Sequence, residues 1–124
     1  MNKSAGILRI ETGITMNHNG FECIYSSVPI HIGKGVYLAN GAYIYCIGNG
    51  DDVYIGDYTT IGGELILFPG TKIGKHCTFG TGTIIVAGSF CIGNGCVMSR
   101  GCTITQDVPE NSLVVGRRGL IFNK

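Results

Sequence analysis

Three histidines in this 124-residue sequence could act as a general base near neutral pH, namely His18, His31 and His76. His18 lies in Asn-His-Asn-Gly, a stretch typical of an exposed loop. Three histidines could also hold a zinc ion, but zinc needs its ligands to converge on one point. The gaps of thirteen and forty-five residues between these histidines do not favour such a site. The spacing therefore disfavours a zinc site.

The six cysteines could in principle form disulfides or bind metal. They lie at positions 23, 46, 77, 91, 96 and 102. No Cys-x-x-Cys pair occurs, and no Cys/His cluster has zinc-finger spacing. We therefore interpret them as structural thiols.

The composition favours a small, ordered protein that binds copies of itself. Hydrophobic residues make up 44% of the sequence and charged residues only 14%, which argues against disorder and for apolar surface buried between subunits. The net charge of +1 lacks the basic excess of a nucleic-acid-binding protein. The sequence has neither the apolar run of a membrane span nor a secretory signal, so we expect a cytoplasmic protein.

The sequence repeats with a period of six residues. Eleven hexads fit one frame, with a one-residue slip at Cys91. Their first residues are large and apolar: Ile32, Leu38, Ile55, Ile61, Leu67, Ile73, Phe79, Ile85, Ile92, Met98 and Ile104. The second position is usually Gly, and the fifth is small or β-branched except at Leu65. This period does not fit the 3.6-residue turn of an α-helix.

Short strands joined by bends explain the repeat. Three such strands would close a triangular coil of about eighteen residues, and successive coils would stack about 4.8 Å apart. The large first residue and the small fifth residue would then point inward, and the latter position includes Cys77, Cys96 and Cys102. This frame predicts two interior ladders, Ile55–Ile73–Ile92 and Leu67–Ile85–Ile104. Residues 45–54 contain a strong turn signal and break the frame, so we expect a small loop there.

We predict an all-β, single-domain protein over residues 1–124. Residues 1–31 would form an irregular N-terminal coil and loop, residues 32–109 the hexapeptide coils, and residues 110–124 a C-terminal strand or tail.

Two segments resemble the hexapeptide-repeat acyltransferase family. The stretch from Val28 to Leu38, Val-Pro-Ile-His-Ile-Gly-Lys-Gly-Val-Tyr-Leu, is similar to the opening coil of that family. The stretch from Arg100 to Gly116, with Asp-Val-Pro followed by Asn-Ser-Leu-Val-Val-Gly, resembles its closing motif. The second match favours the sugar and xenobiotic O-acetyltransferase branch. The resemblance implies a left-handed parallel β-helix (a triangular prism) and a homotrimer with sites between subunits. It also implies transfer of an acetyl group from acetyl-coenzyme A to a hydroxyl of a sugar or sugar-like acceptor.

The resemblance also implies roles for particular residues. His18 occupies the place of the loop histidine that serves as general base. Gly101 and Thr105 would line the path of the pantetheine arm, and Arg117 and Arg118 would meet the phosphates of coenzyme A. No metal is expected. His31 and His76 fall at outward hexad positions, where a surface or inter-subunit contact is the simpler interpretation.

Three alternatives remain open at this stage. The acetyl group could be transferred to an amine instead of a hydroxyl. The chain could be a non-catalytic β-helix that serves as a scaffold or assembly module. A γ-type zinc carbonic anhydrase shares the fold, but the spacing of the three histidines disfavours it.

Overall fold

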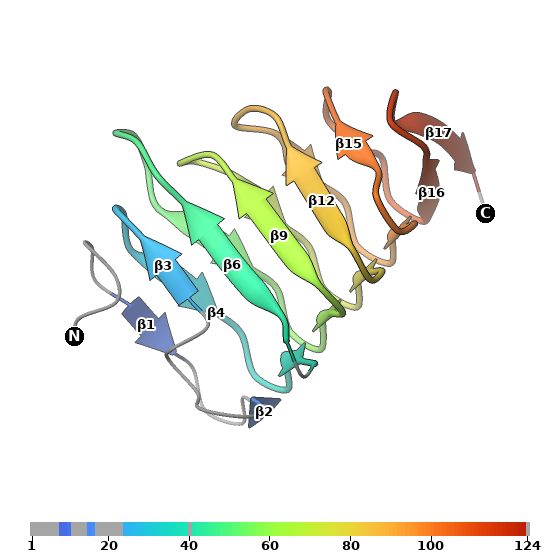
Figure 1. Cartoon of the computed structure of the whole chain (residues 1–124). Helices are drawn as coiled ribbons and strands as arrows, with labels where there is room; N and C mark the ends of the chain where they lie inside the picture. The colour runs from blue at the N-terminus through green and yellow to red at the C-terminus, as the bar shows by residue number, and fades with distance from the viewer. Residues whose placement is uncertain (1–7, 11–14, 17–23, 40, 124) are drawn as a thin grey trace.

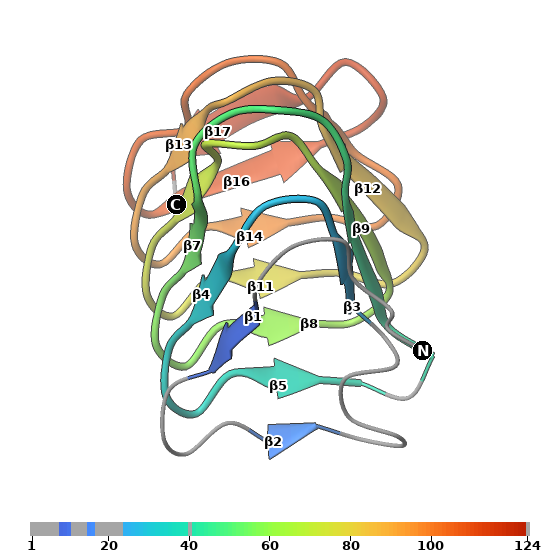
Figure 2. The same cartoon turned by 90° about the vertical axis from the view of Figure 1, so that its left-hand side faces the viewer.

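The structure is a computed structural model that describes residues 8–10, 15–16, 24–39 and 41–123. The described residues form strands and turns only, so they contain no helix that could cross a membrane. The strands stack along one axis, with β1 and β17 toward opposite ends (Figure 1). Viewed from the side, the chain passes through three walls in turn and then begins the next coil (Figure 2).

Three parallel sheets form these walls. Sheet A has five strands, in the order β1 (Leu8–Ile10), β4 (Ile30–Ile32), β7 (Val53–Ile55), β10 (Lys72–Ile73) and β13 (Cys91–Ile92). Sheet B runs β2 (Thr15–Met16), β5 (Tyr37–Leu38), β8 (Thr60–Ile61), β11 (Thr78–Phe79), β14 (Val97–Met98), β16 (Ser112–Val115) and β17 (Leu120–Asn123). Sheet C runs β3 (Ile24–Ser26), β6 (Tyr43–Cys46), β9 (Glu64–Leu67), β12 (Thr83–Val86) and β15 (Thr103–Ile104).

The predicted left-handed parallel β-helix is confirmed. Each strand pairs in parallel with the strand one coil further on, and only the terminal pair β16–β17 is antiparallel among the described strands. The first predicted interior ladder is correct, because Ile55 pairs with Ile73 and Ile73 pairs with Ile92. Left-handed crossovers are rare between parallel strands. Here each crossover runs through one short strand of each of the other two sheets, as β5 and β6 do between β4 and β7.

The second predicted ladder is wrong by one residue. In β12 the buried side chains are Ile84 and Val86, whereas Ile85 points outward and is only partly buried. Val86 pairs with Ile104, and Ile84 pairs with Leu65. The extra residue therefore enters before Val86 and not at Cys91, so that Thr83, predicted to point inward, is exposed.

Small polar residues at the fifth hexad position close the corners of the coil. The buried hydroxyls of Thr59 and Ser112 donate hydrogen bonds to the carbonyl oxygens of Gly74 and Pro109, at 3.0 and 2.8 Å. The thiol of Cys96 donates to the Pro109 carbonyl over 3.0 Å. A short side-chain donor thus pairs with a backbone carbonyl oxygen of the neighbouring coil or turn, which stabilises the bend.

Glycine at the second position allows successive coils to approach. A Cβ atom on Gly56 would lie 2.5 Å from the carbonyl carbon and oxygen of Gly74 in the next coil. No real Cβ tolerates such a contact with backbone, so a side chain here would push the coils apart.

The predicted loop is also present. Ile32 pairs with Ile55, so the coil between them is longer than eighteen residues. The extra residues include 47–52. These residues leave the prism between β6 and β7, and Ile47 is 72% exposed. The insertion lies at the corner between sheets C and A.

The last coils carry an apolar outer surface. The turn after β16 reverses the chain, so that Leu113 pairs with Phe122 and Val115 pairs with Leu120. With Val97, which pairs with Leu113, these residues form what we call the C-terminal apolar face. Leu120 and Phe122 are 55% and 52% exposed. Ile121, between them, packs inward against the core.

Candidate functional site

The outward side chains of sheet A form a polar stripe across successive coils. His31 on β4 pairs with Tyr54 on β7, and Tyr54 pairs with Lys72 on β10. Because parallel strands stack in register, equivalent outward side chains lie directly beside one another. Asp52, one residue before β7, completes the group that we call the sheet A site.

His31 is fixed from two sides within this site. Its ring stacks on Tyr54, with ring centroids 4.3 Å apart and planes 8° from parallel. Its Nε2 lies 2.8 Å from Asp52 Oδ2. A carboxylate can only accept, so the Nε2–H donates and Nδ1 is left as the unprotonated nitrogen of the neutral ring. This arrangement holds the ring in one orientation and one tautomer, as a general base requires.

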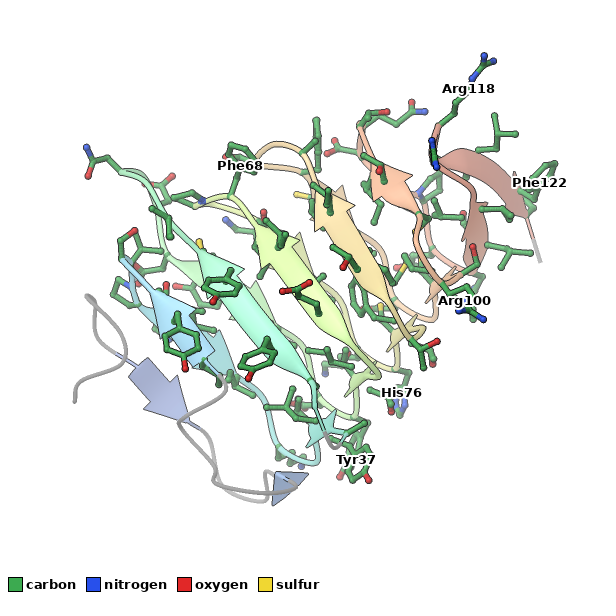
Figure 3. The ribbon with its side chains drawn as sticks, viewed as in Figure 1. Tyr37, Phe68, His76, Arg100, Arg118 and Phe122 are labelled. Carbon is green, nitrogen blue, oxygen red and sulfur yellow. The ribbon has the colours of Figure 1, made fainter. Side chains whose placement is uncertain are left out.

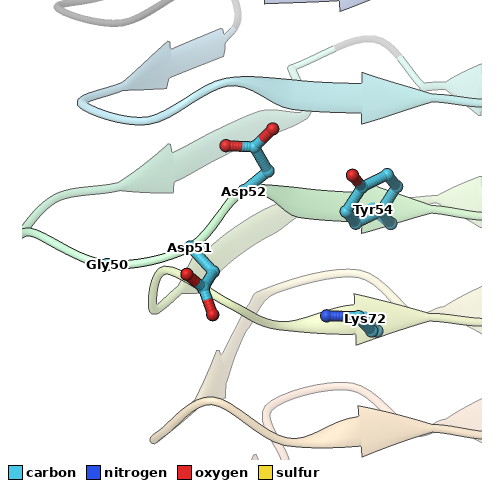
Figure 4. A pocket seen from close by; sticks show the side chains of 5 residues that line it. All are labelled: Gly50, Asp51, Asp52, Tyr54 and Lys72. Atoms are coloured by element: carbon cyan, nitrogen blue, oxygen red, sulfur yellow. The ribbon is translucent and has the colours of Figure 1, made fainter.

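Two adjoining pockets open beside Tyr54. The larger, of about 530 Å³, is lined by Gly50, Asp51, Asp52, Tyr54 and Lys72 (Figure 4). The smaller, of about 230 Å³, is lined by His31, Tyr54 and the backbone of Gly33 and Gly56, among others. Lys72 Nζ lies 5.5 Å from the Tyr54 ring centroid, within the range of a cation–π contact. The sheet A site, together with Asp51 in the larger pocket, can thus offer a base, two carboxylates and one ammonium group to a small polar ligand.

The sequence prediction missed most of this site. Asp52, Tyr54 and Lys72 carry no motif, and residues 47–52 interrupt the frame that would have aligned Tyr54 with His31. The only signal was the turn-rich stretch itself. His31 was interpreted as a surface or inter-subunit contact, and its bond to Asp52 was not predicted.

The other two histidines have different outcomes. His18 lies outside the described residues. His76 lies at a turn between sheets A and B, where its ring stacks on Tyr58 with centroids 5.3 Å apart. Both residues have left-handed backbones, with φ of 57° and 59°. Gly35 precedes them in the same corner column, and a Cβ on it would lie 2.4 Å from the Tyr58 ring. His76 is thus part of a corner stack and has no carboxylate partner among the described residues.

The predicted coenzyme A residues lie toward the C-terminal end of the prism. Gly101 lies in the turn between β14 and β15, and nothing comes within 4 Å of the position of a Cβ there. Arg117 and Arg118 are exposed on the turn between β16 and β17, with Arg118 pointing away from the sheets (Figure 3). The amide of Thr103 donates to the Gly116 carbonyl over 3.3 Å, which places this arginine turn beside the strand that follows Gly101. Thr105 is exposed just after that strand.

Four of the five described cysteines are buried in the fold. Cys77, Cys96 and Cys102 are buried in the inward slots that the repeat predicts, and Cys46 is buried as well. Burial raises the pKa of the Cys46 and Cys77 thiols, and raises that of Cys102 to about 11. A thiol that keeps its proton is a poor nucleophile. Cys91 is exposed, and no disulfide links the five cysteines in the described ranges.

No group of three His, Cys, Asp or Glu side chains that could bind a metal ion occurs in the part of the chain that the structure describes. There His31 and His76 lie apart, each stacked on its own tyrosine.

The repeat and the fold agree with one family of sequences. The profile described as the hexapeptide repeat of succinyl-transferase matches residues 20–46 and 70–106, more than half of the chain. The chain belongs to the hexapeptide-repeat family. The matched stretches include His31 of the sheet A site and Gly101 and Thr105 of the predicted donor site.

Several curated relatives resemble this hexapeptide-repeat protein. The bifunctional protein GlmU of Streptomyces griseus is 34% identical over 93 residues, which cover 69% of this chain and 18% of that protein. The serine acetyltransferase of Bacillus licheniformis is 31% identical over 70% of this chain and 48% of its own length. The serine acetyltransferase of Helicobacter pylori is 25% identical over 77% and 61%. The chain thus spans about a fifth to three fifths of these relatives. No solved structure matches significantly.

Proposed function

We propose that this protein is an acetyl-coenzyme A-dependent O-acetyltransferase that acts on a hydroxyl of a sugar or sugar-like acceptor. The observation that carries the proposal is the family match, together with two relatives named serine acetyltransferase. The geometry is compatible with direct transfer, in which the acceptor oxygen attacks the thioester carbonyl and coenzyme A thiol leaves. The raised pKa values of the buried thiols support a route without an acyl-enzyme.

In this proposal His18 is the general base. It would take the proton of the acceptor hydroxyl as the oxygen attacks, and backbone N–H groups would stabilise the oxyanion. His31 is the rival, because Asp52 leaves its Nδ1 free to accept a proton.

The donor would lie along the outside of the prism. Gly101 leaves open space for the pantetheine arm, and the exposed guanidinium groups of Arg117 and Arg118 suit phosphate oxygens. His31 lies about four inter-strand steps along the axis from the coil of the two arginines, roughly 20 Å. An extended coenzyme A molecule could bridge that distance, with its thioester toward the N-terminal coils.

We further propose a homotrimer in the cytoplasm. The C-terminal apolar face supports subunit contact, since side chains such as Leu120 and Phe122 are unusually exposed for their size. Free thiols are typical of the reducing cytoplasm. The proposed donor, acetyl-coenzyme A, is made inside cells and favours the same compartment.

Paired variants test the proposal and the choice of base. We expect the wild-type protein to acetylate at least one member of a panel of mono- and oligosaccharides, with the product detected by mass spectrometry. We expect His18→Ala to lower kcat by about 10²–10⁴-fold, the usual contribution of a general base, and His31→Ala to lower it less than tenfold. The opposite order would make His31 the base. A protein that binds no acetyl-coenzyme A and transfers nothing would be a scaffold.

A further inference from the structure

We propose that three tyrosines of sheet C bind the ring face of a neutral saccharide. Tyr25 on β3 and Tyr43 and Tyr45 on β6 form this tyrosine platform. The ring of Tyr25 lies 5.2 Å from that of Tyr45 and 6.2 Å from that of Tyr43, measured between centroids. The rings of Tyr43 and Tyr45 are 6.3 Å apart, and the three pairs of planes meet at 21–28°. The sheet face that carries them turns toward the viewer in Figure 3.

The parallel sheet holds these rings outside the core. Tyr25 pairs with Tyr45 across the two strands, and the side chains alternate so that Ile44 and Cys46 fill the interior. Tyr43 and Tyr45 are therefore 39% and 36% exposed although their backbone is paired in the sheet. A ligand that stacks on them would not have to order a loop first, which keeps the entropy cost of binding low.

The surroundings of the platform select a neutral, hydroxyl-rich ligand. The five strands of sheet C contain one charged residue, Glu64, whose carboxylate accepts a hydrogen bond of 2.8 Å from the Thr83 hydroxyl. They contain no Lys or Arg, so the face lacks the cations with which proteins hold phosphates or single-stranded nucleic acid. A pyranose ring offers C–H bonds to the electron-rich ring faces and hydroxyls to the phenol, carboxylate and Thr83 groups nearby.

The platform also bears on the acceptor. His18 precedes Tyr25 by seven residues in the sequence, so the segment that carries the proposed base leads into β3. The statement that the bound saccharide is the acceptor rests on the proposed function, whereas saccharide binding itself does not.

Saturation-transfer NMR on the intact protein tests the platform, with maltotriose, cellotriose and triacetylchitotriose as probes. We expect at least one of them to bind with saturation transferred mainly to the C–H protons of a ring. Tyr45→Ala should weaken that binding by about tenfold, since a stacked aromatic contact contributes on that order. Tyr45→Phe keeps the ring and should change binding by less than about threefold. Tyr37→Ala removes a tyrosine of matched exposure, 37%, from sheet B and should leave binding unchanged.

Several results would overturn the platform. One is that the wild-type protein binds none of the three probes. Another is that folded Tyr45→Ala protein binds as well as wild type. A third is that Tyr37→Ala protein loses as much binding as Tyr45→Ala protein does. Loss of self-association in Tyr45→Ala, without saccharide binding by wild type, would show that a second copy of the chain covers this face. Binding of acetyl-coenzyme A is measured separately. A protein that binds a saccharide but no acetyl-coenzyme A would refute the proposed transferase activity and would leave the tyrosine platform supported.

Discussion

A histidine that is fixed by a carboxylate is the chemically most informative residue of the described chain. Asp52 holds His31 in one tautomer and Tyr54 holds its plane. His18 was predicted as the base from resemblance alone, and His31 was ranked below it. The bond to Asp52 could not be predicted, because residues 47–52 change the number of residues between the two strands that bring them together.

The buried thiol of Cys102 makes a separate prediction at this scale. Its folded pKa is about 11, above the value of about 8.5 for an unperturbed thiol. Stability from the protonated thiol is therefore complete below the unfolded pKa and is lost as the pH rises through the folded value. We expect the melting temperature of wild type to fall more between pH 8 and pH 11 than that of Cys102→Ala.

Circular dichroism melts of both proteins across that range would measure the difference. All other groups are common to both proteins, so their contributions cancel in the comparison. Parallel pH curves for wild type and Cys102→Ala would show that the thiol does not keep its proton in the fold.

At the scale of strands and coils, the hexapeptide period was sufficient to predict the class of fold, the inward cysteines and the ladder through Ile55 and Ile73. It could not place the insertions. Hexad counting cannot distinguish an extra residue before Val86 from one at Cys91, because both restore the frame at Ile92. Packing decides the matter, since Ile84 fills the interior next to Leu65.

The register of β12 predicts unequal effects for two adjacent isoleucines. Ile84 is 1% exposed, whereas Ile85 points outward. We expect Ile84→Ala to lower the free energy of unfolding by about 2–5 kcal/mol, the usual effect of truncating a buried isoleucine. Ile85→Ala should lower it by less than about 1 kcal/mol. Urea unfolding measures both, and an equal or reversed effect would support the frame predicted from the sequence.

At the scale of the whole molecule, the proposed homotrimer would bury the C-terminal apolar face between subunits. We expect sedimentation equilibrium to give about three times the mass of one chain. Phe122→Glu places a charge in this face and should dissociate the trimer, because an unpaired charge is costly to bury. Phe68→Glu alters a phenylalanine of comparable exposure, 44% against 52%, at a different place on the prism (Figure 3), and should leave the trimer intact.

A trimer that survives Phe122→Glu would show that the subunits meet through another sheet. A monomeric wild-type protein would contradict the proposed homotrimer and, with it, active sites formed between subunits.

The central claim is that this β-helix uses acetyl-coenzyme A, and thermal unfolding with the donor tests it most directly. A ligand that binds only the folded state raises its stability by about 2.7 kcal/mol at one hundred times its Kd. We expect millimolar acetyl-coenzyme A to raise the melting temperature by several degrees, and Arg117→Ala/Arg118→Ala protein to show a smaller shift. An unchanged melting temperature in the wild-type protein would contradict the account.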